Sequence, residues 1–143
     1  MILYIFLLIY FLFLAEWYGR EPGGYVEPRY NLIPFLEIKR FWRHRSALGA
    51  KIVFLNLFGN VIGFIPLGFL LPIVSPVFKK PGIVICLGFC ISMTVECLQL
   101  VLRVGSCDID DVILNTLGTV IGYLSYRICN AVRRRFYGKK TKV

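Results

Sequence analysis

Carboxylate and amide side chains are the groups in this 143-residue chain that could do chemistry, and they concentrate in two short segments. One segment supplies Glu96 and Gln99, and the other supplies Asp108, Asp110 and Asp111. Carboxylates act as general acids and bases, and their oxygen atoms bind hard divalent cations. A phosphate-handling site built on the three aspartates would need Mg²⁺ or Ca²⁺, so a divalent cation is the candidate cofactor.

Cysteine and histidine chemistry has little support in the sequence. The five cysteines include no CxxC pair, and their odd number disfavours a disulfide framework. Cys86, Cys90 and Cys97 share one apolar run, and the single histidine, His44, lies in a basic run without a serine or cysteine partner. We therefore predict that the cysteines are small apolar residues without a disulfide or a metal.

The elements that position the acidic and amide groups must be membrane helices. Hydrophobic residues make up 57% of the chain and charged residues only 17%, against about 25% in soluble domains, which excludes an ordinary soluble globule and a disordered chain. Four apolar runs approach the roughly 20 residues that a bilayer requires. The sequence thus predicts one all-α domain, an integral membrane bundle of four transmembrane helices over residues 1–18, 52–77, 82–102 and 112–131.

The first run could also be a cleaved signal peptide. It lacks the basic start of a signal peptide, and Phe13 stands where a small residue should precede a cleavage site at Ala15. We favour a retained helix, with Trp17 and Tyr18 as its anchor at the membrane interface.

The loop over residues 19–51 is the only long polar segment, and it opens with glycines and prolines. From Phe35 to Leu48, apolar residues recur at nearly helical spacing with basic residues between them. This pattern predicts a short helix that lies in the membrane interface. A helix merely packed on the bundle is the alternative, and the sequence does not separate the two.

Basic residues indicate the orientation. The net charge is +9, and six lysines and arginines occupy the tail at 132–143, which we expect to be too short and too basic to fold alone. The positive-inside rule favours a multi-pass plasma-membrane protein with both termini in the cytoplasm and the 19–51 loop outside, although seven basic residues in that loop oppose it. No basic and aromatic face lies outside the apolar runs, so nucleic acid is excluded as a partner.

Three of the predicted helices carry a polar stripe at the same end of the bundle, because successive helices are antiparallel. At 100° per residue, each set of polar residues falls on one helix face. Together these stripes predict one pocket, on the outer side, lined by Asn56, Asn60, Glu96, Gln99, Arg103, Asp108, Asp110, Asp111 and Asn115. Glu96 is the deepest acid, and Arg103, one heptad later on its stripe, is the cation expected to compensate it.

A purely structural interpretation of these residues stays open. Buried amides and acids can hydrogen-bond helix to helix, and aspartates before a helix often only cap it. The small-residue pairs Gly59/Gly63 and Gly118/Gly122 have the spacing that lets helices approach closely.

Four segments together resemble the VanZ-like family. They are NLIPF at 31–35, NLFGNVIGFIPLG at 56–68, the Ser92-Glu96-Gln99 stripe, and DIDDVILNTLG at 108–118. The resemblance implies a small bacterial membrane protein of the cell envelope that is linked to resistance against glycopeptides of the teicoplanin type. Family members often carry an arginine three residues before the first aspartate, where this chain has Gly105.

Two classes of function follow from these observations. The chain could be a binding factor whose partners are membrane lipids, a lipid-linked cell-wall precursor or an anionic lipid. It could instead be an intramembrane hydrolase or transferase for a lipid-linked or phospholipid substrate, with Glu96, Asp108 and Asp111 as the candidate catalytic residues. The sequence leaves the oligomeric state open.

Overall fold

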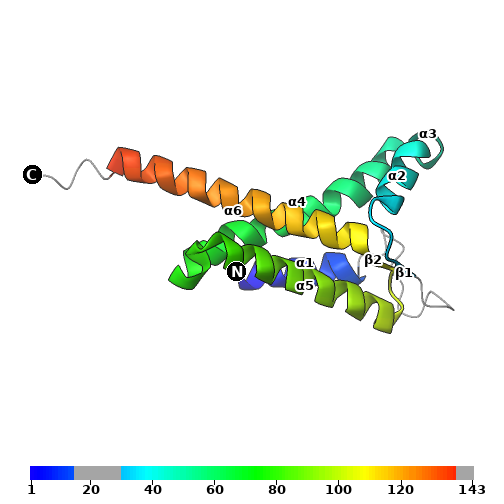
Figure 1. The fold of residues 1–143 in the computed structure, drawn as a ribbon, viewed down its shortest axis with the longest axis horizontal. Coiled ribbons are helices and arrows are strands. Elements are labelled where there is room, and N and C mark those ends of the chain that lie inside the picture. The colour runs from blue at the N-terminus through cyan, green and yellow to red at the C-terminus, as the bar shows by residue number, and fades with distance from the viewer. Residues whose placement is uncertain (15–29, 138–143) are drawn as a thin grey trace, which may run out of the picture.

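The structure is a computed structural model, and it describes residues 1–14 and 30–137. Three long helices dominate it (Figure 1). The elements in chain order are α1 (Ile2–Ile9), the π-helical η1 (Tyr10–Leu14), β1 (Tyr30–Asn31), α2 (Leu36–Arg43), α3 (Arg45–Leu48), α4 (Ala50–Val74), the 3₁₀ turn η3 (Pro76–Lys79), α5 (Pro81–Leu102), β2 (Cys107–Asp108) and α6 (Ile109–Tyr137). The predicted anchor at Trp17 and Tyr18 and the glycine- and proline-rich start of the loop lie outside the described residues.

The all-α prediction is confirmed, and in the described residues three helices are long and apolar enough to cross a membrane: Val53–Val74, Pro81–Leu102 and Ile109–Phe136. Pro81 begins α5, where its missing N–H and fixed φ suit a first helical turn. The first apolar run forms a shorter helical segment, Ile2–Phe13, in its described part. The count of four membrane spans therefore stays a prediction.

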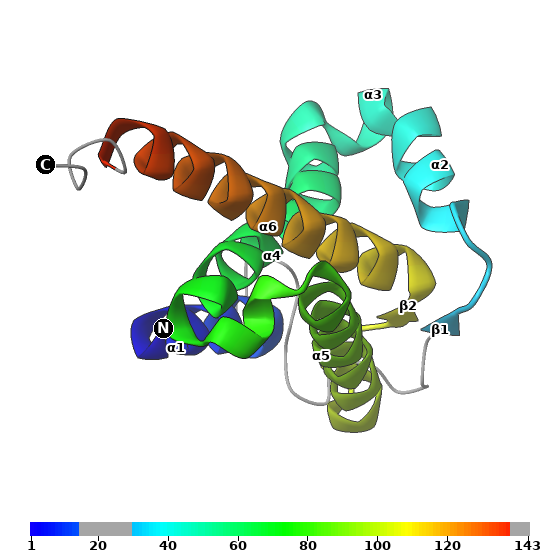
Figure 2. The ribbon, with the colours of Figure 1, turned by 60° about the vertical axis from the view of Figure 1, so that its left-hand side comes forward.

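Glycines bring α6 against both of its long neighbours, and Figure 2 shows α6 crossing α4 with α5 beside it. An added Cβ at Gly68 of α4 would overlap the carbonyl oxygen of Thr119, and one at Gly122 of α6 would overlap that of Ile65. Gly88 of α5 lies against the Thr119 side chain in the same way. The predicted close approach through Gly118 and Gly122 is present, because both lie against backbone carbonyls of α4. Gly63 of the other predicted pair instead has the Leu8 side chain at an ordinary distance, and Gly68 makes the close approach from α4.

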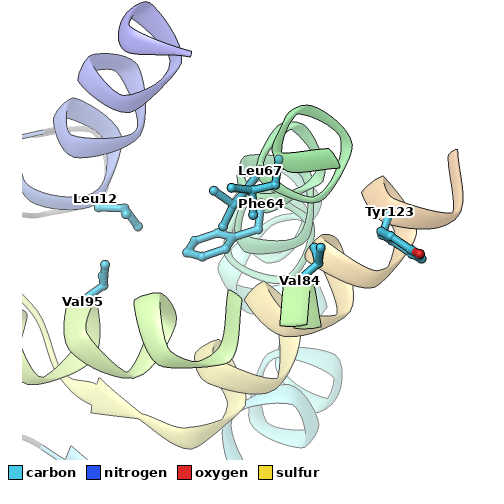
Figure 3. Packing of buried hydrophobic residues seen from close by; sticks show 7 residues of the cluster. Leu12, Phe64, Leu67, Val84, Val95 and Tyr123 are labelled. Atoms are coloured by element: carbon cyan, nitrogen blue, oxygen red, sulfur yellow. The ribbon is translucent and has the colours of Figure 1, made fainter. Parts of the chain in front are cut away.

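The apolar core joins the N-terminal helix to the long helices. Figure 3 shows Leu12 of η1 facing Val95 of α5, with Phe64 of α4 between them and Val84. All four side chains are buried, and Phe64 is only 1% exposed. Burying these side chains holds η1 against α4 and α5, since each buried apolar side chain contributes roughly 1.5–3 kcal/mol.

The helix predicted between Phe35 and Leu48 is present as two pieces, while its place in the membrane interface stays a prediction. α2 ends before His44, and the short α3 follows it before Gly49 turns the chain into α4 with a φ of 83°. A left-handed φ of this kind suits glycine because it has no Cβ. The sequence pattern did not predict the small parallel ladder in which Tyr30 pairs with Cys107 and Asn31 with Asp108.

The end of α6 lies later in the chain than predicted. The last membrane helix was predicted to end at residue 131, but α6 continues as helix to Tyr137 and extends beyond the ends of the other helices (Figure 1). The arginines at 133–135 therefore belong to its last turns. Basic side chains near a helix C-terminus interact favourably with the helix dipole, which supports this extension.

Candidate functional site

The segment between α5 and α6 is fixed by buried carboxylates. The Oε2 atom of Glu96 accepts a hydrogen bond from the backbone N–H of Asp108 at 3.0 Å. Oδ1 of Asp108 in turn accepts the backbone N–H of Asp110 at 2.9 Å and the side-chain Nδ2 of Asn31 at 3.0 Å. Asp108 thereby caps the start of α6 and ties it to β1, which is 77 residues away in the chain.

Asp110 caps a helix other than its own. Its side chain is 1% exposed, and it accepts backbone N–H groups from the start of α2. Oδ1 accepts the N–H of Phe35, and Oδ2 accepts those of Glu37 at 2.9 Å and Ile38 at 3.1 Å. Phe35 has a φ of 64°, which turns the chain so that these donors converge. A carboxylate on α6 therefore positions the whole of α2.

Two further contacts link α6 to the other long helices. Nδ2 of Asn60 on α4 donates to Oδ1 of Asp111. One turn deeper, Nδ2 of Asn115 donates to Oγ of Ser92 on α5 at 2.9 Å, and both residues are fully buried. We call Asn60, Glu96, Asp108, Asp110 and Asp111 the polar cluster.

Gln99 is directed to the first helix. Its Nε2 donates to the backbone carbonyl of Leu12 at 2.8 Å, inside the π-helical segment η1. A π-helical turn leaves backbone groups out of the regular α-helical pattern, and such turns occur often at functional sites. Gln99 thus anchors η1 to α5 and does not belong to the polar cluster.

Arg103 does not continue the stripe of Glu96. α5 ends at Leu102, and Arg103 is its C-cap with a φ of 55°, in the left-handed region. The predicted stripe assumed one more helical residue, and the change of backbone conformation turns this side chain out to an exposed position. Asn56 lies half-buried on α4, one turn before Asn60.

The backbone at Arg103 makes a testable prediction. We expect Arg103→Gly to leave the free energy of unfolding unchanged or to raise it by up to about 1 kcal/mol, because a left-handed conformation costs L-residues about that much. Chemical unfolding in detergent measures this difference. Arg103→Ala is the control, since alanine keeps the strain, and a Gly variant less stable than the Ala variant would contradict the prediction.

The environment of the polar cluster is negative. Burial raises the pKa of the Asp108 carboxyl, and the nearby Asp110 adds to this, while the N–H of Asp110 and the amide of Asn31 oppose it. Burial and the charges of Glu96 and Asp108 likewise raise the pKa of the Cys107 thiol. Cys107 is thus held as a neutral thiol rather than as a reactive thiolate.

The pKa of Asp108 predicts a pH dependence of stability. A carboxyl whose pKa is raised on folding holds its proton more tightly in the folded state, so stability falls as the pH rises from about the ordinary value of 3.8 through the raised value. Asp108→Asn should flatten this part of the stability curve, because an amide does not titrate, while its carbonyl oxygen still accepts the same bonds. Thermal unfolding in detergent across this pH range tests it, and a variant with the wild-type slope would contradict it.

An apolar cavity adjoins the polar cluster. It has a volume of about 340 Å³ and lies between α1 with η1 on one side and α4 on the other. Its walls include Tyr4, Leu8, Phe11, Phe54 and Phe64. The amide residues Asn60 and Asn115 also line it. Asn60 in addition donates a hydrogen bond to Asp111. The polar cluster and the apolar cavity therefore share a wall.

The predicted metal ligands are engaged in other contacts. In residues 1–14 and 30–137, no group of three or more histidine, cysteine, aspartate or glutamate side chains is arranged to hold a metal ion. Asp108 and Asp110 accept backbone N–H groups, and Asp111 contacts Asn60. Sequence reasoning missed Asn31 as a site residue, although its motif NLIPF was a signal for it.

Comparisons with known proteins found a family and a relative that the chain resembles. The family model VanZ/LLP1 matches residues 1–130. Protein VanZ from Enterococcus faecium is 32% identical over 104 residues, which make up 71% of this chain and 63% of that protein, so the match covers less than two thirds of the relative. The comparison with solved structures found no match. The family match over most of the chain and this identity show that the chain belongs to the VanZ-like family.

Proposed function

We propose that the chain is a cell-envelope membrane protein that binds a lipid or a lipid-linked cell-wall precursor at the polar end of its bundle. Through this binding it would lower the susceptibility of the cell to glycopeptides of the teicoplanin type, the property with which the family is linked. The proposal places the polar cluster at the outer face of the plasma membrane, with both termini in the cytoplasm.

The position of Asn60 carries this proposal. Its amide donates to Asp111 in the polar cluster and also lines the apolar cavity between α1 and α4. A ligand that occupied both places would need a polar head joined to an apolar chain, which describes a lipid. Binding sites of this kind are mostly apolar, with a few polar groups that fix the orientation of the ligand.

The basic surface of α2 adds a second contact with lipid. Lys39, Arg40 and Arg43 are exposed on this helix, and the apolar Trp42 is exposed beside them. Such a combination of basic and aromatic side chains suits the headgroup layer of an anionic membrane. Because Asp110 holds α2 at the start of α6, this basic surface lies near the polar cluster.

The enzymatic alternative has less support from the contacts. Glu96, Asp108 and Asp110 each accept hydrogen bonds from backbone N–H groups, which gives them a structural role in fixing the segment before α6 and the start of α2. These three acids therefore build the site, and Asp111, Asn60 and Asn115 are the residues we expect to contact the ligand.

Teicoplanin susceptibility tests the proposal. The chain and its variants are expressed in a teicoplanin-susceptible Gram-positive host, and the inhibitory concentration is measured beside the membrane level of each protein. Glu96→Gln and Asp111→Asn remove charge but keep shape, so we expect each to abolish the protection that the wild type gives. Glu37→Gln is the matched control, since this acid forms an ion pair with Arg40 within α2.

Two outcomes are decisive. If both charge-removing variants reach normal membrane levels and protect as well as the wild type, the polar cluster is only structural and the proposal fails. If they lose protection while Glu37→Gln keeps it, the cluster is a functional site.

A further inference from the structure

Asn115 lines the apolar cavity, and one of its side-chain polar atoms has no partner. The residue is completely buried, its Nδ2 is used by Ser92, and its Oδ1 has no hydrogen-bond partner among the residues that the structure describes. Turning the amide over would exchange the two atoms and still leave one of them without a partner. Buried polar atoms without a partner are rare in native proteins, so this one points to a missing ligand atom.

The cavity limits what that ligand can be. Apart from Asn60 and Asn115, its walls are almost entirely apolar side chains and backbone of α1, η1 and α4. At about 30 Å³ for a water-sized group, its 340 Å³ hold roughly ten such groups, which is enough for one lipid chain. A water molecule would want two to four polar partners, which these walls supply poorly.

We propose that this cavity binds a single apolar lipid chain whose polar end donates a hydrogen bond to Oδ1 of Asn115. The ligand class is thus a lipid with a free hydroxyl or amide N–H close to the chain. The three membrane-length helices place such lipids all around the protein, and the gap between α1 and α4 is where the chain enters. This inference rests on the proposed lipid-binding function and names the chemistry of its ligand.

Gly63 provides a way to close the cavity without unfolding the protein. It lines the cavity, and an added Cβ there would lie 3.8 Å from Cδ1 of Leu8, an ordinary contact. Gly63→Leu should therefore fill the space with its side chain. Gly82→Leu is the matched control, because Gly82 has nothing within 4 Å of its added Cβ.

The test uses two probes with the same chain, 1-decanol and decyl methyl ether, of which only the alcohol donates a hydrogen bond. Binding to the purified full-length protein in detergent is measured by native mass spectrometry. We expect the wild type and Gly82→Leu to bind the alcohol about tenfold more tightly than the ether, the effect of leaving one buried acceptor unpaired. Asn115→Leu should bind both probes equally, and Gly63→Leu should bind neither.

Equal binding of the two probes by the wild type would rule out a hydrogen bond from the ligand to Asn115. Unchanged binding by Gly63→Leu would overturn the cavity as the site. Asp111→Asn separates this inference from the proposed function, because a simple alcohol has no head for the polar cluster. If Asp111→Asn still binds the alcohol more tightly than the ether, the cavity site is supported. This conclusion holds even if the susceptibility test shows that protection does not depend on the polar cluster.

Discussion

Gly122→Ala is expected to separate α6 from α4 and to lower the free energy of unfolding. Overpacking a core usually costs about 1–3 kcal/mol. The cost should lie at or above the upper end of this range, because the added methyl group meets the backbone carbonyl of Ile65 rather than a side chain that can rotate away. The measurement is the midpoint of unfolding in mixed detergent micelles.

The reciprocal contact sharpens this test. Gly68→Ala should have a similar effect, since its methyl group meets the carbonyl of Thr119 on α6. One outward shift of the helix relieves both overlaps, so the double variant should lose less stability than the sum of the two single variants. Gly82→Ala, with free space around it, should unfold like the wild type, and wild-type stability of Gly122→Ala would refute the close packing.

Asp110→Ala is expected to release α2 from the bundle while the long helices stay folded. The substitution removes the acceptor of three backbone N–H groups, and bonds to a charged acceptor contribute about 1.5–3 kcal/mol each. Amide hydrogen exchange at Phe35, Glu37 and Ile38 should therefore accelerate by about a hundredfold or more, equivalent to ~2.7 kcal/mol. Exchange within α5 should not change.

Two further variants define the cause of this release. Asp110→Asn keeps one acceptor oxygen, so its exchange rates should lie between those of the wild type and Asp110→Ala. Glu37→Gln removes an acid from α2 itself and breaks its ion pair with the exposed Arg40, which contributes about 0–1 kcal/mol, so α2 should stay protected. Equal protection of α2 in Asp110→Ala and the wild type would contradict the cap.

The long helices could be predicted from the sequence because a membrane helix depends on the local run of apolar residues. The predicted run at 82–102 and the observed helix Pro81–Leu102 differ by one residue. The end of α6 was harder, since its last turns are stabilised by helix propensity and by the dipole rather than by hydrophobicity. Hydropathy therefore stopped at residue 131, while the helix continues to Tyr137.

The site was only partly predictable, because helical periodicity states which face a residue occupies and not what it contacts. Periodicity placed Asn60 and Asp111 on polar faces at the same end of the bundle, and the structure joins them. It could not show that Asp110 reaches α2, because those partners lie 72–75 residues earlier in the chain. Arg103 was misplaced because periodicity does not register where a helix ends.

The length of α6 sets the depth at which the protein sits in its membrane. Asp111 and Arg134 lie on the same unbroken helix, and at 1.5 Å per residue they are about 35 Å apart. The hydrocarbon core of a bilayer is about 30 Å thick. If the arginines at 133–135 lie among the headgroups of one leaflet, Asp111 lies at the opposite boundary of the hydrocarbon core. In a much thicker bilayer one charged end would lie in hydrocarbon, so this spacing matches a bilayer of ordinary thickness.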